Sequence, residues 1–115
     1  RNIDWLRNEG WNNVEGIDKK NGTAIEVIEP KQYDTIFTMS CLFTIPPQDE
    51  WVFEKIASMA KKFIITIEGE TTSVGAGVIG RNYKEVFEPL GFKEIACKHF
   101  VFNEFGVLRV FKRNG

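Results

Sequence analysis

Acidic residues stand where a parallel sheet would bring them to a ligand-binding edge. Asp18 ends a strand expected over residues 13–18, and Glu68 and Glu70 follow a strand expected over 63–67. Parallel α/β sheets bind ligands at the carboxyl ends of their strands. A carboxylate there can accept hydrogen bonds from two vicinal hydroxyls, or it can accept a proton. A solvated turn is the alternative for Asp18, and Glu68 is the stronger candidate of the two glutamates.

Polar side chains also follow a strand expected over residues 35–39. Ser40, Cys41 and Thr44 would lie at the same edge as the acids, where they can contact a ligand or simply reflect the polarity of a loop. Cys41 is not an evident nucleophile, because no basic residue near it in sequence would lower its pKa. Cys41 and Cys97 lack CxxC spacing and the chain has one histidine, so the sequence predicts neither a metal site nor a Ser-His-Asp triad.

A glycine-rich segment precedes the last expected helix. Residues 75–80, GAGVIG, satisfy GxGxxG, but seven residues separate Ile67 from the first glycine. In the dinucleotide fingerprint the first glycine follows its strand at once. The spacing therefore favours a mobile lid or a substrate loop over a phosphate cradle. Arg81 and Tyr83 follow directly; a guanidinium there can hold a carboxylate or a phosphate, although a surface position fits equally well.

The order of the expected elements is helix, strand, strand, helix, strand, helix, strand, strand. The strands at 35–39 and 63–67 are nearly continuous in apolar or β-branched residues, which is typical of buried parallel strands. A helix begins near Pro46-Pro47 and carries apolar residues at intervals of three and four, from Trp51 to Ala60. Another spans about 82–90 and ends at Gly91, before strands at about 92–99 and 107–112. This order predicts an α/β fold: a mostly parallel sheet with helices on both faces and an antiparallel C-terminal hairpin.

Composition favours a single globular domain and argues against nucleic-acid-binding and membrane-spanning proteins. The 115 residues predict a single domain, and 43% hydrophobic with 27% charged residues is ordinary for a globular protein. A net charge of −1 argues against a nucleic-acid partner, since the basic pairs 19–20, 61–62 and 112–113 are short and scattered. No apolar run approaches membrane-spanning length. A cytoplasmic protein that does not bind membranes is expected.

Three segments resemble the class I S-adenosylmethionine-dependent methyltransferases, which have a Rossmann-like sheet. Residues 1–18, RNIDWLRNEGWNNVEGID, are similar to the family's first helix and second strand, whose terminal acid holds the cofactor ribose. Residues 33–47, YDTIFTMSCLFTIPP, are similar to its fourth strand and the following loop. Residues 81–95, RNYKEVFEPLGFKEI, are similar to its last helix and sixth strand. The family's reversed final strand would account for the closing hairpin.

The resemblance implies S-adenosylmethionine as the cofactor and a small molecule as the methyl acceptor, held in line with the sulfonium methyl. It assigns no catalytic residue. The cofactor-binding positions that it implies are Asp18, Lys19, Met39, Ser40 and Cys41. The substrate-binding positions are Thr44, Glu68, Arg81 and Tyr83. The (D/N)PPY signature of amino-methylating DNA enzymes is missing, which weighs against a DNA substrate.

Two departures from the family pattern bear on cofactor binding. The family's first strand and glycine-rich turn, commonly GCGxG, would come before Arg1, so we expect a partial domain truncated at its N-terminal strand. Only fifteen residues separate Asp18 from Asp34, which shortens the segment that flanks the adenine. We therefore expect the 115 residues alone to bind the cofactor weakly or not at all.

The missing strand also suggests an alternative class of protein. Without it, the strands at 13–18 and 34–39 would flank a gap with unpaired backbone edges, and such edges recruit other strands. A homodimer through these edges is one expectation, and a rearranged sheet is another. A non-catalytic Rossmann-like module that pairs with another chain is the alternative to the enzyme.

Overall fold

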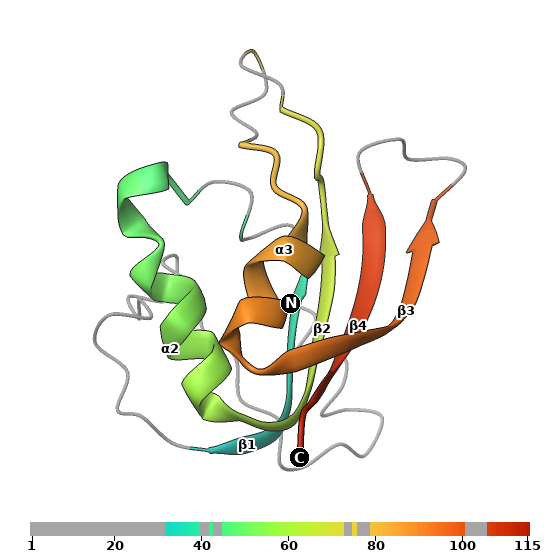
Figure 1. The fold of residues 1–115 in the computed structure, drawn as a ribbon. Coiled ribbons are helices and arrows are strands. Elements are labelled where there is room, and N and C mark those ends of the chain that lie inside the picture. The colour runs from blue at the N-terminus through green and yellow to red at the C-terminus, as the bar shows by residue number, and fades with distance from the viewer. Residues whose placement is uncertain (1–31, 40–41, 43–44, 73–74, 76–78, 101–105) are drawn as a thin grey trace, which may run out of the picture.

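A four-stranded mixed sheet forms the centre of the fold. The computed structural model describes residues 32–39, 42, 45–72, 75, 79–100 and 106–115. The strands are β1 (Tyr33–Met39), β2 (Ala60–Glu68), β3 (Phe92–His99) and β4 (Val107–Arg113), in the spatial order β1-β2-β4-β3 (Figure 1). β1 and β2 are parallel, whereas β4 runs antiparallel to both of its neighbours. The predicted parallel pair and the antiparallel pairing of the last two strands are therefore confirmed. The prediction of a mostly parallel sheet is not met among the described strands, because β4 lies between β2 and β3 and only the β1–β2 pairing is parallel.

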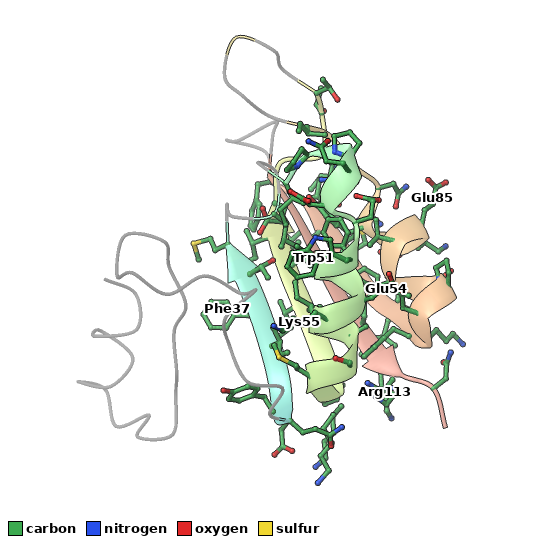
Figure 2. All side chains as sticks on the ribbon, turned by 90° about the vertical axis from the view of Figure 1, so that its left-hand side faces the viewer. Phe37, Trp51, Glu54, Lys55, Glu85 and Arg113 are labelled. Carbon is green, nitrogen blue, oxygen red and sulfur yellow. The ribbon has the colours of Figure 1, made fainter. Side chains whose placement is uncertain are left out.

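Two short helices cover one face of this sheet (Figures 1 and 2). A 3₁₀ turn, η4 (Pro47–Asp49), leads into α2 (Trp51–Met59), and α3 (Tyr83–Phe87) continues into a second turn, η5 (Glu88–Leu90). The helices contact each other through aromatic rings: Phe53 of α2 lies 6.1 Å from Tyr83 and 6.0 Å from Phe87, between ring centroids. Edge-to-face pairs at this distance stabilise the packing beyond their buried area.

The core lies between these helices and the sheet. Successive strand residues point to opposite faces, and the face toward the helices carries Ile64 of β2 opposite Phe111 of β4, both fully buried. The other face is more open, with Phe37 45% and Met39 46% exposed on β1. The main buried cluster consists of Leu42, Val52, Phe53, Ile56, Ala57, Ala60, Ile64, Tyr83, Phe87, Phe92 and Phe111.

Capping residues explain where the helical segment formed by α3 and η5 begins and ends. The Asn82 side chain accepts a hydrogen bond from the backbone N–H of Lys84 at 3.0 Å, which satisfies a donor that the first turn leaves free. Gly91 follows η5 with φ +99°, a left-handed conformation that residues with a Cβ adopt at a cost. The predicted helix start near residue 82 and its end at Gly91 are both confirmed.

Several boundaries and exposures differ from the sequence prediction. The predicted helix extended to Ala60, but α2 ends at Met59 and Ala60 is the first residue of β2. The chain therefore passes from helix to strand without a loop. Trp51 is 40% exposed, since it lies at the start of α2 on the solvent side. β1 is an edge strand among the described residues and is largely exposed, although a buried strand was predicted. Asp34 lies within β1 rather than before it.

The prediction of helices on both faces is not met within the described residues, because α2 and α3 share one face. The helix expected near the N-terminus and the strand at 13–18 fall in residues 1–31, outside the part that the structure describes. The hairpin turn at 103–106 also lies outside it, apart from Gly106.

Candidate functional site

Buried polar side chains form a row across the helix-covered face of the sheet, near the carboxyl ends of β1 and β2. Thr38 is the cross-strand partner of Thr66, and Thr66 is the partner of Arg109 on β4. Their exposed fractions are 6%, 0% and 7%. Neither threonine hydroxyl has a hydrogen-bond partner among the described residues. Buried polar groups are normally paired, so the row is a place where a polar ligand or water can bind.

Glu68 ends β2 in the same row and is only 1% exposed. Its Oε1 accepts a hydrogen bond from the backbone N–H of Leu42 at 3.0 Å, within the segment that follows β1. A carboxylate that is bonded in this way holds the two strand ends together. Glu68 thus positions the chain next to residues 40, 41 and 44, which the sequence predicts to contact ligands.

A second carboxylate, Glu70, is fully engaged in an ion-pair network. Arg109 donates to it from Nε at 2.7 Å and from Nη2 at 2.9 Å, and donates from Nη1 to Glu94 Oε1 at 2.5 Å. Hydrogen bonding to Glu70, reinforced by that to Glu94, raises the pKa of Arg109 against the opposing effect of burial. The guanidinium therefore stays cationic. The network ties the start of the glycine-rich loop to β3 and β4.

Arg81 and Tyr83 approach this row from the start of α3. Tyr83 is fully buried, and its pKa is raised well above the ordinary value, first by burial and then by the negative charge of Glu68, while the Arg81 guanidinium acts in the opposite direction. Its hydroxyl therefore remains protonated. The guanidinium of Arg81 stacks over the Phe53 ring, 4.9 Å from the centroid, and Nη2 lies 2.8 Å from Glu50 Oε2.

Thr72 and Gly80, which flank most of the glycine-rich loop, are joined by a hydrogen bond. The N–H of Gly80 donates to Thr72 Oγ1 at 3.0 Å. A Cβ on Gly80 would lie 2.4 Å from the carbonyl oxygen of Glu70, so no other residue fits without a backbone shift. The last glycine of GAGVIG is thus required by close backbone approach. Residues 76–78 lie outside the described part of the chain, so the lid or substrate-loop reading stays a prediction.

The predicted site residues fall into three groups. Glu68, Arg81 and Tyr83 are brought together by the fold. Met39 ends β1, but it points to the opposite sheet face from Thr38 and is 46% exposed. The others lie outside the described residues, namely Asp18, Lys19, Ser40, Cys41 and Thr44.

Sequence reasoning missed part of the polar row. Thr38, Thr66 and Arg109 were not candidates, because each looks like an ordinary polar residue inside an apolar strand. The only signal was alternation: Thr66 and Glu68 occupy every second position, and Arg109 stands two residues after buried Val107. Deciding which alternate face is buried requires the strand pairing, which the sequence alone does not give.

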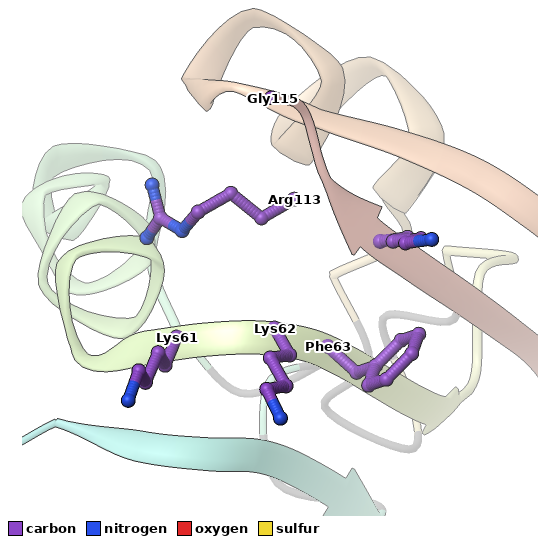
Figure 3. A pocket seen from close by; sticks show the side chains of 6 residues that line it. Lys61, Lys62, Phe63, Arg113 and Gly115 are labelled. Carbon is purple, nitrogen blue, oxygen red and sulfur yellow. The ribbon is translucent and has the colours of Figure 1, made fainter.

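A basic pocket of about 420 Å³ lies at the other end of the sheet (Figure 3). Its lining residues are Lys61, Lys62, Phe63, Lys112, Arg113 and Gly115. The pairs 61–62 and 112–113 are therefore gathered rather than scattered, because β2 and β4 are antiparallel neighbours. Arg113 is engaged structurally: it donates to the carbonyl oxygens of Ala57 and Ala60 at the end of α2 and stacks over Phe92 at 4.7 Å.

In the part of the chain that the structure describes, no group of three or more His, Cys, Asp or Glu side chains is arranged to hold a metal ion. No helix in that part combines the length and the apolar composition that crossing a bilayer requires.

In comparison with solved structures, the α/β fold of four mixed strands and two helices is similar to part of a methyltransferase structure. The chain is similar to magnesium protoporphyrin IX methyltransferase (ChlM) from Synechocystis PCC 6803 with bound SAH, at a TM-score of 0.62 and 14% identity. For the same enzyme with bound SAM, the TM-score is 0.65 and the identity 12%. The matches cover 81% and 80% of this chain but only 49% and 44% of the enzyme. No family model and no curated protein sequence matches this chain.

Proposed function

We propose that this chain is part of an S-adenosylmethionine-dependent methyltransferase that acts on a small-molecule acceptor. The observation that carries the proposal is the likeness of its sheet and helices to an enzyme solved with bound SAM and with bound SAH. The buried polar row supports it, because it lies at the carboxyl ends of the parallel strands, where α/β sheets bind ligands.

On the cofactor side, the proposal assigns Asp18 to the ribose hydroxyls and gives further contacts to Lys19, Met39, Ser40 and Cys41. The bond from Leu42 N–H to Glu68 fits this assignment, since a buried carboxylate holds the backbone immediately after residues 40 and 41. The unpaired hydroxyls of Thr38 and Thr66 fit a polar ligand at this edge. When bound, the cofactor supplies an electrophilic methyl group on a sulfonium.

On the acceptor side, the proposal assigns contacts to Thr44, Glu68, Arg81 and Tyr83. Methyl transfer from a sulfonium needs little covalent help from the protein; the gain comes from orienting the acceptor and excluding water. Glu68 and Tyr83 are 1% and 0% exposed, which fits a dry site. The absence of an evident nucleophile–base pair among the described residues is consistent with this chemistry.

Calorimetric titration with S-adenosylhomocysteine tests the proposal. We expect weak or no binding by the 115 residues alone, and micromolar affinity in an extended protein if an apolar strand ending in Gly-x-Gly is encoded before Arg1. In that protein Asp18→Ala should weaken binding at least about tenfold, because charge-assisted hydrogen bonds contribute roughly 1.5–3 kcal/mol each. Asp34→Ala is the matched control, since Asp34 lies near the N-terminal end of β1, away from the carboxyl ends of the strands where the ligand is proposed to bind. Unchanged affinity in Asp18→Ala, with an unchanged melting temperature, would contradict the assignment.

A non-catalytic module that pairs with another chain remains the second candidate. The observation in its favour is β1, which pairs only with β2 among the described residues and leaves Phe37 and Met39 nearly half exposed. Pairing through this edge would also give a homodimer. Sedimentation analysis separates these cases: a concentration-dependent dimer that binds no S-adenosylhomocysteine in the extended protein would favour the module.

A further inference from the structure

The guanidinium of Arg81 is buried with incomplete hydrogen bonding. Its side chain is only 10% exposed, and neither Nη1 nor Nη2 makes an aligned hydrogen bond to any described residue. Nη2 lies 2.8 Å from Glu50 Oε2, so the two are an ion pair, but the carboxylate is out of line with the N–H bonds. A guanidinium offers five donors in a fixed fork, and leaving them unpaired in a buried position is costly.

The hydroxyl of Tyr83 adds a second unpaired donor close by. It is fully buried and has no hydrogen-bond partner among the described residues. Burial and the charge of Glu68 oppose ionisation and raise the pKa of Tyr83, whereas the charge of Arg81 and its approach to the Tyr83 oxygen lower it, and the hydroxyl keeps a proton that it can donate. Both groups pack against the Phe53 ring: the guanidinium of Arg81 lies 4.9 Å from its centroid, and the ring centroid of Tyr83 lies 6.1 Å from it. A permanent cation and a permanent hydroxyl donor thus stand side by side without a complete set of acceptors.

We propose that Arg81 and Tyr83 form an anion subsite that binds a carboxylate of the methyl acceptor, an inference that rests on the proposed function. A carboxylate can accept two parallel hydrogen bonds from a guanidinium fork, and such bidentate pairs are short and strong. The Phe53 ring, whose centroid lies 4.9 Å from the Arg81 guanidinium carbon, supports the guanidinium and restricts its movement before the ligand arrives.

The charges around the subsite favour a carboxylate over a phosphate. Glu68 and Glu70 both act on Tyr83 with negative potential. A phosphate monoester carries close to two negative charges at neutral pH, whereas a carboxylate carries one. Glu50 already presents a carboxylate to Arg81 and is itself 56% exposed. The contact with Glu50 shows that a carboxylate can approach the Arg81 guanidinium.

Glu50 also explains how a ligand can reach a guanidinium that is covered in the free protein. An ion pair with one partner in solvent contributes little to stability, so the Glu50 side chain can swing away at low cost. The incoming carboxylate then replaces a misaligned contact with aligned hydrogen bonds. Glu50 is a competitor for the ligand in this scheme, and its removal should strengthen binding.

The test uses benzoate as the probe and neutral benzamide as its uncharged analogue. Both are titrated into the full chain while the Nε–Hε signals of arginine are followed by NMR. We expect benzoate to bind and benzamide not to bind, with inorganic phosphate weaker than benzoate. Arg81→Gln should abolish benzoate binding, and Glu50→Gln should tighten it several-fold. Glu54→Gln, on the exposed side of α2, is the matched control and should change nothing.

Tyr83→Phe keeps the proposal testable if Arg81→Gln fails to fold. It removes one unpaired hydroxyl and no described contact of that hydroxyl, so the melting temperature should stay the same or rise. Benzoate affinity should nevertheless fall about tenfold, as expected for one hydrogen bond to a charged group. A purely structural role of the pair would lower stability and leave affinity alone.

Equal binding of benzoate by the unchanged chain and Arg81→Gln, equal binding of benzamide, or tighter binding of phosphate would overturn the subsite. A parallel titration with S-adenosylhomocysteine distinguishes failure of the subsite from failure of the methyltransferase proposal. It uses the extended protein defined above, in which a strand ending in Gly-x-Gly precedes Arg1. Benzoate binding without any S-adenosylhomocysteine binding there would support the anion subsite and contradict the methyltransferase. S-adenosylhomocysteine binding without benzoate binding would contradict the subsite alone.

Discussion

The strongest effect on stability is expected from Arg109, the centre of the network with Glu70 and Glu94. Its three hydrogen bonds measure 2.7, 2.9 and 2.5 Å, and the side chains are only 9%, 11% and 14% exposed. Arg109→Met keeps much of the aliphatic stem but removes the cation. Two largely buried carboxylates then lose the counter-charge that they share.

Removing one partner of a buried ion pair typically costs about 3–5 kcal/mol. Glu70 and Glu94 retain slight exposure and can take up water, so we expect the lower end for Arg109→Met, about 3 kcal/mol. In a chain of this size, that corresponds to a fall in melting temperature of roughly 10–15 °C. Urea denaturation followed by tryptophan fluorescence measures the free energy of unfolding directly.

Two comparisons sharpen this test. Lys112→Met, on the same strand but exposed, should change the free energy of unfolding by no more than about 0.5 kcal/mol. The triple variant Arg109→Met, Glu70→Gln, Glu94→Gln should be more stable than Arg109→Met alone, because it leaves no uncompensated charge. A loss below about 1 kcal/mol in Arg109→Met, or a triple variant that is less stable than the single one, would refute the reasoning.

Three further outcomes follow from single residues. Because the folded-state pKa of Tyr83 is raised above its ordinary value of 10.0, its contribution to stability should be complete below pH 10 and lost as the pH rises further. The free energy of unfolding should therefore fall more steeply above pH 10 in the unchanged protein than in Tyr83→Phe, and equal slopes would contradict this. Gly91→Ala should cost about 1–2 kcal/mol in urea denaturation from backbone strain alone, since φ is +99° and no atom lies within 4 Å of the added Cβ. Asn82→Ala should cost about 1 kcal/mol by removing the helix cap, a loss that Asn82→Ser should largely avoid.

Much of the framework was predictable because its causes are local. The apolar run at 63–67 requires burial, and it lies within β2, toward the C-terminal end of that strand. Asn82 and Gly91 mark the ends of a helical segment through their own capping and dihedral preferences. The parallel pairing of β1 with β2 followed from the helix between them, since a crossover helix brings the next strand back in the same direction.

The composition of the site was less predictable because it depends on pairing between distant segments. Thr66 and Arg109 are neighbours only through the β2–β4 register, and Glu70 meets Arg109 across 39 residues. The basic pairs at 61–62 and 112–113 converge for the same reason. Of the predicted site residues, Glu68, Arg81 and Tyr83 are brought together, but their assignment to the substrate stays a prediction.

Hydrogen-bond satisfaction separates two kinds of polar residue within this one site. Arg109 has an acceptor for each nitrogen and joins three elements, so its substitution should act on stability first. Arg81 and Tyr83 are buried nearby, yet they lack aligned acceptors among the described residues. Burying a donor without an acceptor costs free energy. A ligand that supplies acceptors to these two residues would offset that cost when it binds. Tyr83→Phe should therefore change binding while the free energy of unfolding stays nearly constant or rises, the reverse of the pattern expected at Arg109.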